Sequence, residues 1–281
     1  MIGIHDPCRR STGGGKGGCQ VDREPNVVRV GGVTLGEGMP KICVPVMGYT
    51  LEEIRAAAAR AAQAGADLME LRMDSLSPMP SPEAARAACA AARAGGDLPL
   101  LFTLRTVRDG GAGDADAQAY EALLTDMARS GCCEALDCEL SVGDAAFVRI
   151  AKAARAAGVA LVGSSHAFTT PENMETPARW LTRQAALGAD VCKAAVMAGN
   201  RVQALEAAWR MARAGEETGR PYIAIVMGAE GTLTRAACEC VGSCLTFASA
   251  GEASAPGQMD ARALRGTLAL IHGAMAGKRA P

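Results

Sequence analysis

Residues 41–65 read KICVPVMGYTLEEIRAAAARAAQAG, and they contain the unit from which the rest of the chain is built. Residues 41–48 are mostly apolar and include several β-branched side chains, which is typical of a buried strand. The following residues are Ala-rich with charges at helical spacing, and acidic residues follow Thr50. The stretch therefore predicts a strand and then a helix that begins after Thr50 and ends at Gly65.

The same pattern recurs along the chain. Further apolar β-type runs, separated by amphipathic Ala-rich stretches, are DLMELRMD (67–74), LPLLFTLRT (98–106), CEALDCEL (133–140), VALVGSSHAF (159–168), DVCKAAVM (190–197), PYIAIVMG (221–228) and LTFAS (245–249). With the opening stretch they give strand–helix units about every 25–30 residues, which predicts a parallel sheet. Eight units in about 250 residues suit a closed α/β (β/α)₈ TIM barrel. A doubly wound open sheet is the alternative.

Outside these units, the stretch NVVRVGGVTLGEG (26–38) has two short β-type runs around Gly31-Gly32. It predicts a β-hairpin that closes the bottom of the barrel. Residues 1–25 are Gly-rich, polar and without periodicity, which is typical of a flexible tail. We therefore expect one catalytic barrel domain over residues 26–281.

Helix ends can be predicted from capping residues. Ser81 and Thr176 precede Pro or acidic residues and are expected to cap helices as Thr50 does. Gly131 and Gly158 are expected to end helices, because glycine tolerates the left-handed conformation there.

Composition excludes several classes of function. The net charge is −1 and no block of like charge stands out, which argues against a nucleic-acid partner. No apolar run reaches the roughly 18 residues of a membrane span, and no apolar stretch resembling a signal peptide opens the chain, so we expect a cytoplasmic protein. Gly13, Gly15 and Gly18 match the spacing of a dinucleotide-binding loop, but no strand precedes them and no helix follows. No cofactor is expected.

The sequence contains 11 cysteines, an odd number without a CxxC motif. Many lie in predicted strands or helices, so we interpret them as reduced, small core residues. A metal cluster of Cys238, Cys240 and Cys244 is the alternative. Positions two apart do not share a helical face and no histidine is near them in the sequence, which argues against that cluster.

Polar residues interrupt the predicted strands near their ends, where a barrel of this kind carries its chemistry. They are Glu70, Arg72, Asp74, Arg105, Asp109, Asp137, Glu139, His166 and Lys193. Residues two apart, such as Asp137 and Glu139, share one face of a strand. For the carboxylate pairs, the alternative to a functional site is a layer of ion pairs that fills the barrel.

Lys193 stands in the middle of an apolar strand, where an ammonium group is costly unless it is paired or loses its proton. The chain has 29 basic residues, of which 24 are arginine and only 5 are lysine, so arginine is the usual choice when a positive charge is needed. A desolvated amine can attack a ketone, and His166 at the neighbouring strand end can move a proton. This pair indicates Schiff-base lyase or aldolase chemistry.

From about Val33 to the last helix, the chain resembles the type I 3-dehydroquinate dehydratases of the shikimate pathway. The resemblance rests on GEGMPKI (36–42), ELRMD (70–74), FTLRT with two glycines (102–111), SSHAF (164–168), DVCKAAVMA (190–198) and TRAACECVGSCLTFASAGEASAPGQ (234–258). It implies that Lys193 forms an imine with the ketone of 3-dehydroquinate. It also implies that His166 moves the proton in a syn elimination to 3-dehydroshikimate, and that the enzyme is a homodimer.

Further site residues follow from the resemblance. Asp109 would orient His166, and Glu70, Arg72 and Arg105 would bind the ring hydroxyls. The substrate carboxylate would be held by Arg235, Ser254 and Gln258, since arginine pairs well with carboxylates.

Three residues depart from the family pattern. Asp109 stands where the family has Glu, Ala167 where Asp is common, and Pro45 where Ser is usual. Because Asp109 is one methylene shorter, Glu139 is a second possible partner for His166. Two other functions stay open: a class I aldolase-type lyase, which would need a phosphate site, and a non-catalytic ligand-binding barrel.

Overall fold

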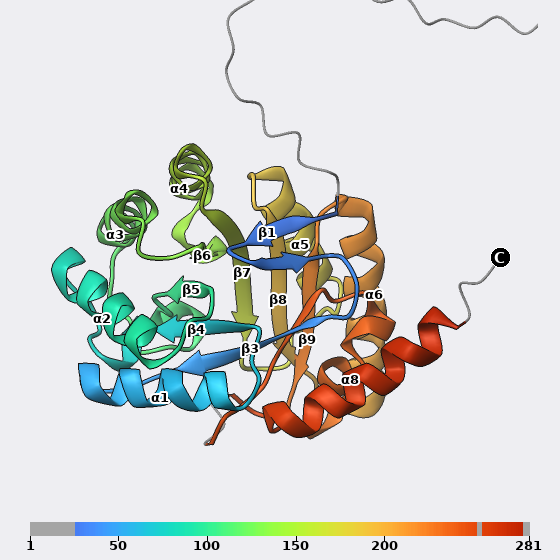
Figure 1. Ribbon diagram of the computed structural model, residues 1–281. Helices are drawn as coiled ribbons and strands as arrows, with labels where there is room; N and C mark the ends of the chain where they lie inside the picture. Colours follow the sequence, from blue (N-terminus) through green and yellow to red (C-terminus); the bar gives the residue numbers. More distant parts are fainter. Residues whose placement is uncertain (1–25, 252–254, 278–281) are drawn as a thin grey trace, which may run out of the picture.

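A computed structural model describes residues 26–251 and 255–277, so the predicted tail, residues 1–25, lies outside the described residues. Eight parallel strands form one sheet that curls into a nearly closed barrel, with helices around it (Figure 1). Chain order gives β3 (Lys41–Val46), β4 (Leu68–Arg72), β5 (Leu100–Thr103), β6 (Ala135–Glu139), β7 (Ala160–Ala167), β8 (Val191–Met197), β9 (Tyr222–Met227) and β10 (Leu245–Phe247). The predicted (β/α)₈ TIM barrel is confirmed.

Helices follow the strands and cover the outside of the sheet. They are α1 (Leu51–Gln63), α2 (Pro82–Gly95), α3 (Ala117–Ser130), α4 (Asp144–Ala157), α5 (Thr176–Ala186), α6 (Arg201–Thr218), the short α7 (Leu233–Ala236) and α8 (Ala261–Ala276). Their buried faces are largely alanine, as in Ala57, Ala58 and Ala61 of α1. Small side chains let these helices approach the strands closely while the charged face stays in water.

The N-terminal hairpin consists of β1 (Val28–Val30) and β2 (Val33–Leu35), paired antiparallel through a turn at Gly31-Gly32. Gly31 packs against Pro99 and Glu134, which directly precede β5 and β6. Val28, Val30 and Leu35 join the apolar cluster that fills the barrel interior. The hairpin therefore closes the end of the barrel at which the strands begin, as predicted.

Two of the three predicted helix caps are confirmed. The hydroxyl groups of Thr50 and Ser81 accept hydrogen bonds from the backbone N–H groups of Glu53 and Ala84. The prediction for Thr176 is wrong, because Thr176 is the first residue of α5 and the capping position is Glu175. Asn173 accepts from the Glu175 N–H through its side chain and from the Thr176 N–H through its carbonyl, so the chain enters the helix earlier.

A gap between β9 and β10 interrupts the ladder of the barrel. These strands are the two ends of the sheet, linked through a bridge between Tyr222 and Ser243. Side-chain hydroxyl groups take over the pairing: Ser243 accepts the N–H of Ala224 at 2.8 Å, and Thr234 accepts the N–H of Val226 at 2.9 Å. We call this gap the seam.

The cysteines in the described part of the chain are free thiols, and most are buried. Burial raises the pKa of Cys238 to about 12, which favours the thiol over the metal-binding thiolate. Cys244 is also buried, whereas Cys240 is exposed. No group of three potential metal ligands occurs among residues 26–251 and 255–277, so the structure does not support the alternative of a cysteine metal cluster. Within those same ranges, no helix has the length and apolar character needed to cross a membrane.

Candidate active site

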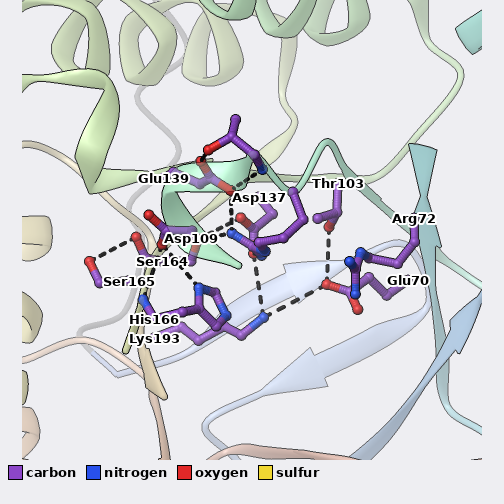
Figure 2. A network of polar contacts seen from close by, with 12 residues as sticks. Glu70, Arg72, Thr103, Asp109, Asp137, Glu139, Ser164, Ser165, His166 and Lys193 are labelled. Atoms are coloured by element: carbon purple, nitrogen blue, oxygen red, sulfur yellow. Dashed lines mark hydrogen bonds and ion pairs between the residues drawn. The ribbon is translucent and has the colours of Figure 1, made fainter. Parts of the chain in front are cut away.

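A pocket opens at the end of the barrel where the strands finish, opposite the hairpin. It collects most of the predicted site residues from six different strands and their following loops. Its lining is Glu70, Arg72, Arg105, Gly110, His166, Phe168, Lys193, Ala195, Ile225, Met227, Arg235, Phe247, Ala255 and Gln258. Figure 2 shows Lys193 and His166 with the carboxylates of Glu70, Asp109 and Asp137 around them.

Lys193 lies at the centre of this network on β8 and is 4% exposed. Its Nζ is 3.5 Å from an oxygen of Asp137 and 3.7 Å from an oxygen of Glu70 (Figure 2). The same Nζ lies 4.2 Å from the centre of the Phe247 ring. Two flanking carboxylates and an aromatic face hold the amine in one place while it still faces the pocket.

The backbone of Lys193 is fixed from outside the barrel. Gln184 on α5 is fully buried, accepts the Lys193 N–H at 2.9 Å and donates its amide to the Lys193 carbonyl at 3.0 Å. A buried amide that satisfies both backbone groups of one residue leaves that residue little freedom. Gln184 was not predicted from the sequence, because nothing in α5 shows which strand residue it faces.

His166 lies near the end of β7, and its side chain is 9% exposed. Its Nδ1 is 3.1 Å from Oδ2 of Asp109, and the same oxygen accepts the His166 backbone N–H at 3.0 Å. Glu139 is instead occupied by Arg105 and by the N–H and hydroxyl of Thr106. Asp109, and not the alternative Glu139, is therefore the carboxylate that contacts the imidazole.

The surroundings of this pair shift both pKa values. Burial lowers the pKa of His166 well below 6.5, and the positive charges of Arg105, Lys193 and Arg72 add to the effect. Asp109 opposes it as a carboxylate close to the ring. Burial and then the negative Glu139 raise the pKa of Asp109 to about 6, although Arg105 acts in the opposite direction. At neutral pH the imidazole is therefore neutral and Asp109 is ionised.

Arg105 organises the floor of the pocket. Its guanidinium pairs with Asp137 at 2.8 Å and with Glu139 at 2.9 Å, and it donates to the Ser164 hydroxyl at 3.0 Å. Ser164 in turn donates to Asp137. Asp137 and Glu139 thus form ion pairs of the kind given as the alternative for the carboxylate pairs, and Asp137 connects them to the pocket residue Lys193.

Glu70 and Arg72 lie beside each other on β4 but have different partners. Glu70 accepts a hydrogen bond from the Thr103 hydroxyl at 3.1 Å. Arg72 makes a two-point contact with Asp74, at 2.9 and 2.8 Å, and its side chain is 15% exposed towards the pocket. Asp74 thereby fixes the direction of Arg72 and leaves part of its fork for a ligand.

Arg235 is the buried cation of the site without a carboxylate partner among the described residues. It is 2% exposed, and burial lowers its pKa to about 10, so it is charged at neutral pH. Its terminal nitrogens donate to the carbonyls of Phe247 at 3.5 Å and Pro256 at 3.1 Å, and its Nε has no described partner. A desolvated, uncompensated guanidinium in a pocket favours an anionic ligand.

Of the remaining predicted residues, Gln258 lines the same pocket, whereas Ser254 lies outside the described residues. Pro45 on β3 pairs in register with Glu70, and Ala167 ends β7, so both departures lie close to the site. Phe168 and Phe247 are lining residues that the sequence reasoning missed. The available signal was composition and position, since the chain has only 4 phenylalanines, of which Phe168 directly follows β7 and Phe247 ends β10.

Comparison with known proteins identifies relatives of the whole barrel. A family model described as type I 3-dehydroquinase matches residues 42–275. The 3-dehydroquinate dehydratase of Klebsiella pneumoniae is 36% identical over 248 residues, which cover 88% of this chain and 99% of that protein.

Solved structures agree with these relatives. Type I 3-dehydroquinate dehydratase from Clostridium difficile, solved with covalently modified comenic acid, has a TM-score of 0.80 at 32% identity and covers 88% of this chain and 98% of its own. The 3-dehydroquinate dehydratase of Geobacillus kaustophilus has a TM-score of 0.83 at 29% identity, with coverage of 89% and 98%.

Proposed function

The chain belongs to the type I 3-dehydroquinases and is thus a hydro-lyase, a 3-dehydroquinate dehydratase, and we propose that it dehydrates its substrate through an imine on Lys193. The observation that carries the proposal is the content of one pocket: a buried amine, a neutral imidazole and an uncompensated guanidinium. These supply a nucleophile, a base and an anion site. An aldolase-type lyase would need a phosphate site as well, and the whole-chain relatives are dehydratases.

In the first step Lys193 passes a proton to His166, and its amine then attacks the C3 ketone of 3-dehydroquinate. His166 returns that proton to the carbinolamine hydroxyl, which leaves as water and gives an iminium ion that withdraws electrons from the adjacent C2. The carboxylates of Asp137 and Glu70, at 3.5 and 3.7 Å from Nζ, are placed to stabilise the positive charge of this intermediate.

In the second step neutral His166 removes a proton from C2. The ring then donates that proton to the C1 hydroxyl, which leaves as water on the same face, and hydrolysis of the imine releases 3-dehydroshikimate and the free lysine. Asp109 accepts the Nδ1–H and so directs the other ring nitrogen at the substrate. One imidazole thereby serves as base and as acid.

Binding groups surround these reacting atoms. We assign the substrate carboxylate to Arg235 and Gln258, together with Ser254. We assign the binding of the ring hydroxyls to Glu70, Arg72 and Arg105. The ion pairs that these side chains already make orient them before the substrate binds.

The direct test of the proposed function is a continuous assay. Purified protein and 3-dehydroquinate should develop the ultraviolet absorbance of the conjugated enone of 3-dehydroshikimate, without any added metal or cofactor. Absence of this signal at high protein concentration would contradict the proposal. Release of a cleaved carbon fragment would favour the aldolase reaction instead.

Arg235 provides the first specific prediction. Arg235→Ala should lower kcat/KM by about 10²–10³-fold, the scale for removing one member of a buried charge pair, and much of the loss should appear in KM. Arg235→Lys should keep the charge but lose the two-point contact, and should fall between alanine and wild type. Arg213→Lys, an exposed change on α6, is the matched control. An unchanged KM in Arg235→Ala would place the carboxylate elsewhere.

The pH profile tests the His166–Asp109 pair. As pH falls through about 6, Asp109 takes up a proton and stops accepting the Nδ1–H, so kcat/KM should decrease below about pH 6. The apparent pKa belongs to the coupled pair. Asp109→Asn should be slow at every pH and should lose this acidic limb. Persistence of the same limb in Asp109→Asn would assign the titration to another group.

The wider context of the protein completes the proposal. We propose that residues 26–281 act as one catalytic domain in the cytoplasm, that the N-terminal residues 1–25 take no part in catalysis, and that the enzyme is a homodimer. A mass of twice 28.7 kDa in sedimentation equilibrium would support the dimer.

A further inference from the structure

The turn that carries Asp109 is anchored by polar contacts towards β4 and β6. It is the one-turn helix η2 (Val107–Asp109). The N–H of Thr106, just before it, donates to Glu139 at 2.8 Å, and the N–H of Ala112, just after it, donates to Asp74 at 3.2 Å. Towards β7, the described polar contact is the Asp109 carboxylate itself, which is also the catalytic contact to His166. The distance between the Asp109 carboxylate and the His166 imidazole therefore depends on the other contacts that hold the turn against β7.

Phe168, the first residue after β7, supplies an apolar contact on that side. Its ring lies directly on Gly110, and a Cβ added to Gly110 would overlap the ring atoms. Gly110 also has φ +79°, in the left-handed region, so glycine meets both requirements of this position. The ring is stacked with the imidazole of His166, with centroids 6.4 Å apart and planes 17° apart. Phe168 thus touches the turn and faces the base at once.

Burial alone does not explain this placement. Phe168 remains 46% exposed at the mouth of the pocket, so it gains only part of the free energy that a core phenylalanine gains. Beneath it, Asp109 is 5% exposed and the His166 side chain 9% exposed. The exposed ring is therefore a cover over a buried acid–base pair.

We propose that Phe168, seated on Gly110, is a positioning residue for the general base: it holds the Asp109 turn against β7 and shields the imidazole from water. The proposal rests on the proposed function, in which His166 is that base. An aspartate side chain is short, so a movement of about 1 Å would stretch the 3.1 Å contact beyond hydrogen-bonding distance. A displacement of this size at a catalytic group can cost about 10²-fold in rate.

Kinetics of Phe168→Ala provide the first test. We expect kcat to fall about 10–100-fold while KM changes by less than about threefold, because the ring acts on the base and not on ground-state binding. Phe168→Leu should recover most of the rate by filling the same space. In an Asp109→Asn background, Phe168→Ala should cost little more, since the contact that it protects is already lost. An increase in KM at unchanged kcat in Phe168→Ala would overturn the proposal. So would a double variant whose loss in kcat equals the product of the losses in Phe168→Ala and Asp109→Asn.

Chemical modification of the imidazole gives a second readout that needs no turnover. Diethyl pyrocarbonate acylates neutral histidine, and peptide mass spectrometry follows His166 with the partly exposed His272 as internal reference. Phe168→Ala and Gly110→Ala should both be acylated several times faster at His166 than wild type, and Phe168→Leu should resemble wild type. Equal rates in wild type and Phe168→Ala would refute the shielding. If wild type fails the enone assay, the proposed function fails, yet this readout still decides the role of Phe168.

Discussion

Lys193→Arg should abolish both turnover and the trapping of substrate on the protein. The guanidinium stays protonated at any usable pH and is not a nucleophile, although it keeps the positive charge between Asp137 and Glu70. We expect a loss of at least about 10⁴-fold in kcat, the scale for removing an attacking group. Borohydride added with 3-dehydroquinate should fix one ligand mass on the peptide that contains Lys193 in wild type, and none in the variant.

Lys152→Arg is the matched control, because Lys152 is an exposed lysine on α4. It should react and trap like wild type. Trapping on a different lysine, or an active wild-type enzyme that never traps, would exclude the imine at Lys193. Retained stability of Lys193→Arg, checked by thermal unfolding, separates a chemical loss from a folding defect.

His166→Ala should retain the imine but lose the elimination. Removal of a general acid–base group typically costs about 10²–10⁴-fold, so kcat should fall within that range. Borohydride trapping after long incubation should still give full labelling of Lys193, because the amine and its carboxylate neighbours remain in place. A stopped assay for 3-dehydroshikimate measures the elimination, and the intact-protein mass after borohydride treatment measures the labelling.

His272→Ala is the control for this change. His272 lies on α8, is not among the described residues that line the pocket, and has its Nδ1 2.8 Å from Glu239. Its loss should leave turnover unchanged. Near-normal turnover in His166→Ala would mean that another group removes the C2 proton, and its pH profile would then have to identify that group.

The sequence allowed the fold to be predicted because each strand–helix unit is regular. The eight runs differ from the observed strands by a few residues at their ends, as in 98–106 against Leu100–Thr103. Such ends depend on where neighbouring strands stop pairing, which a single run does not reveal. The seam was not predicted, since the run LTFAS resembles the others although its strand is limited to Leu245–Phe247, which pairs with β3.

The sequence allowed most residues of the site to be predicted, but not which side chains contact one another. Ionisable residues in the predicted strands indicated Lys193 and His166 as site residues, because burying such a group costs free energy unless it has a partner or a function. Which carboxylate reaches which cation depends on the register between strands and on loop shape. Glu139 and Asp109 were both plausible partners for His166, and only the path of the turn after β5 separates them. Gln184 shows the same limit, since α5 alone does not reveal that it faces Lys193.

The seam also bears on how the protein behaves among its own copies. A strand that ends a sheet normally presents unpaired N–H and C=O groups, and such edges invite another chain to add a strand and start aggregation. Here Ser243 and Thr234 bond the N–H groups of Ala224 and Val226, and both hydroxyls lie within 3.4 Å of the carbonyls of the same residues. These two hydroxyls thus occupy the backbone groups of β9 that a neighbouring strand would otherwise pair. The edge of the interrupted barrel therefore offers few free backbone groups to a strand from another molecule.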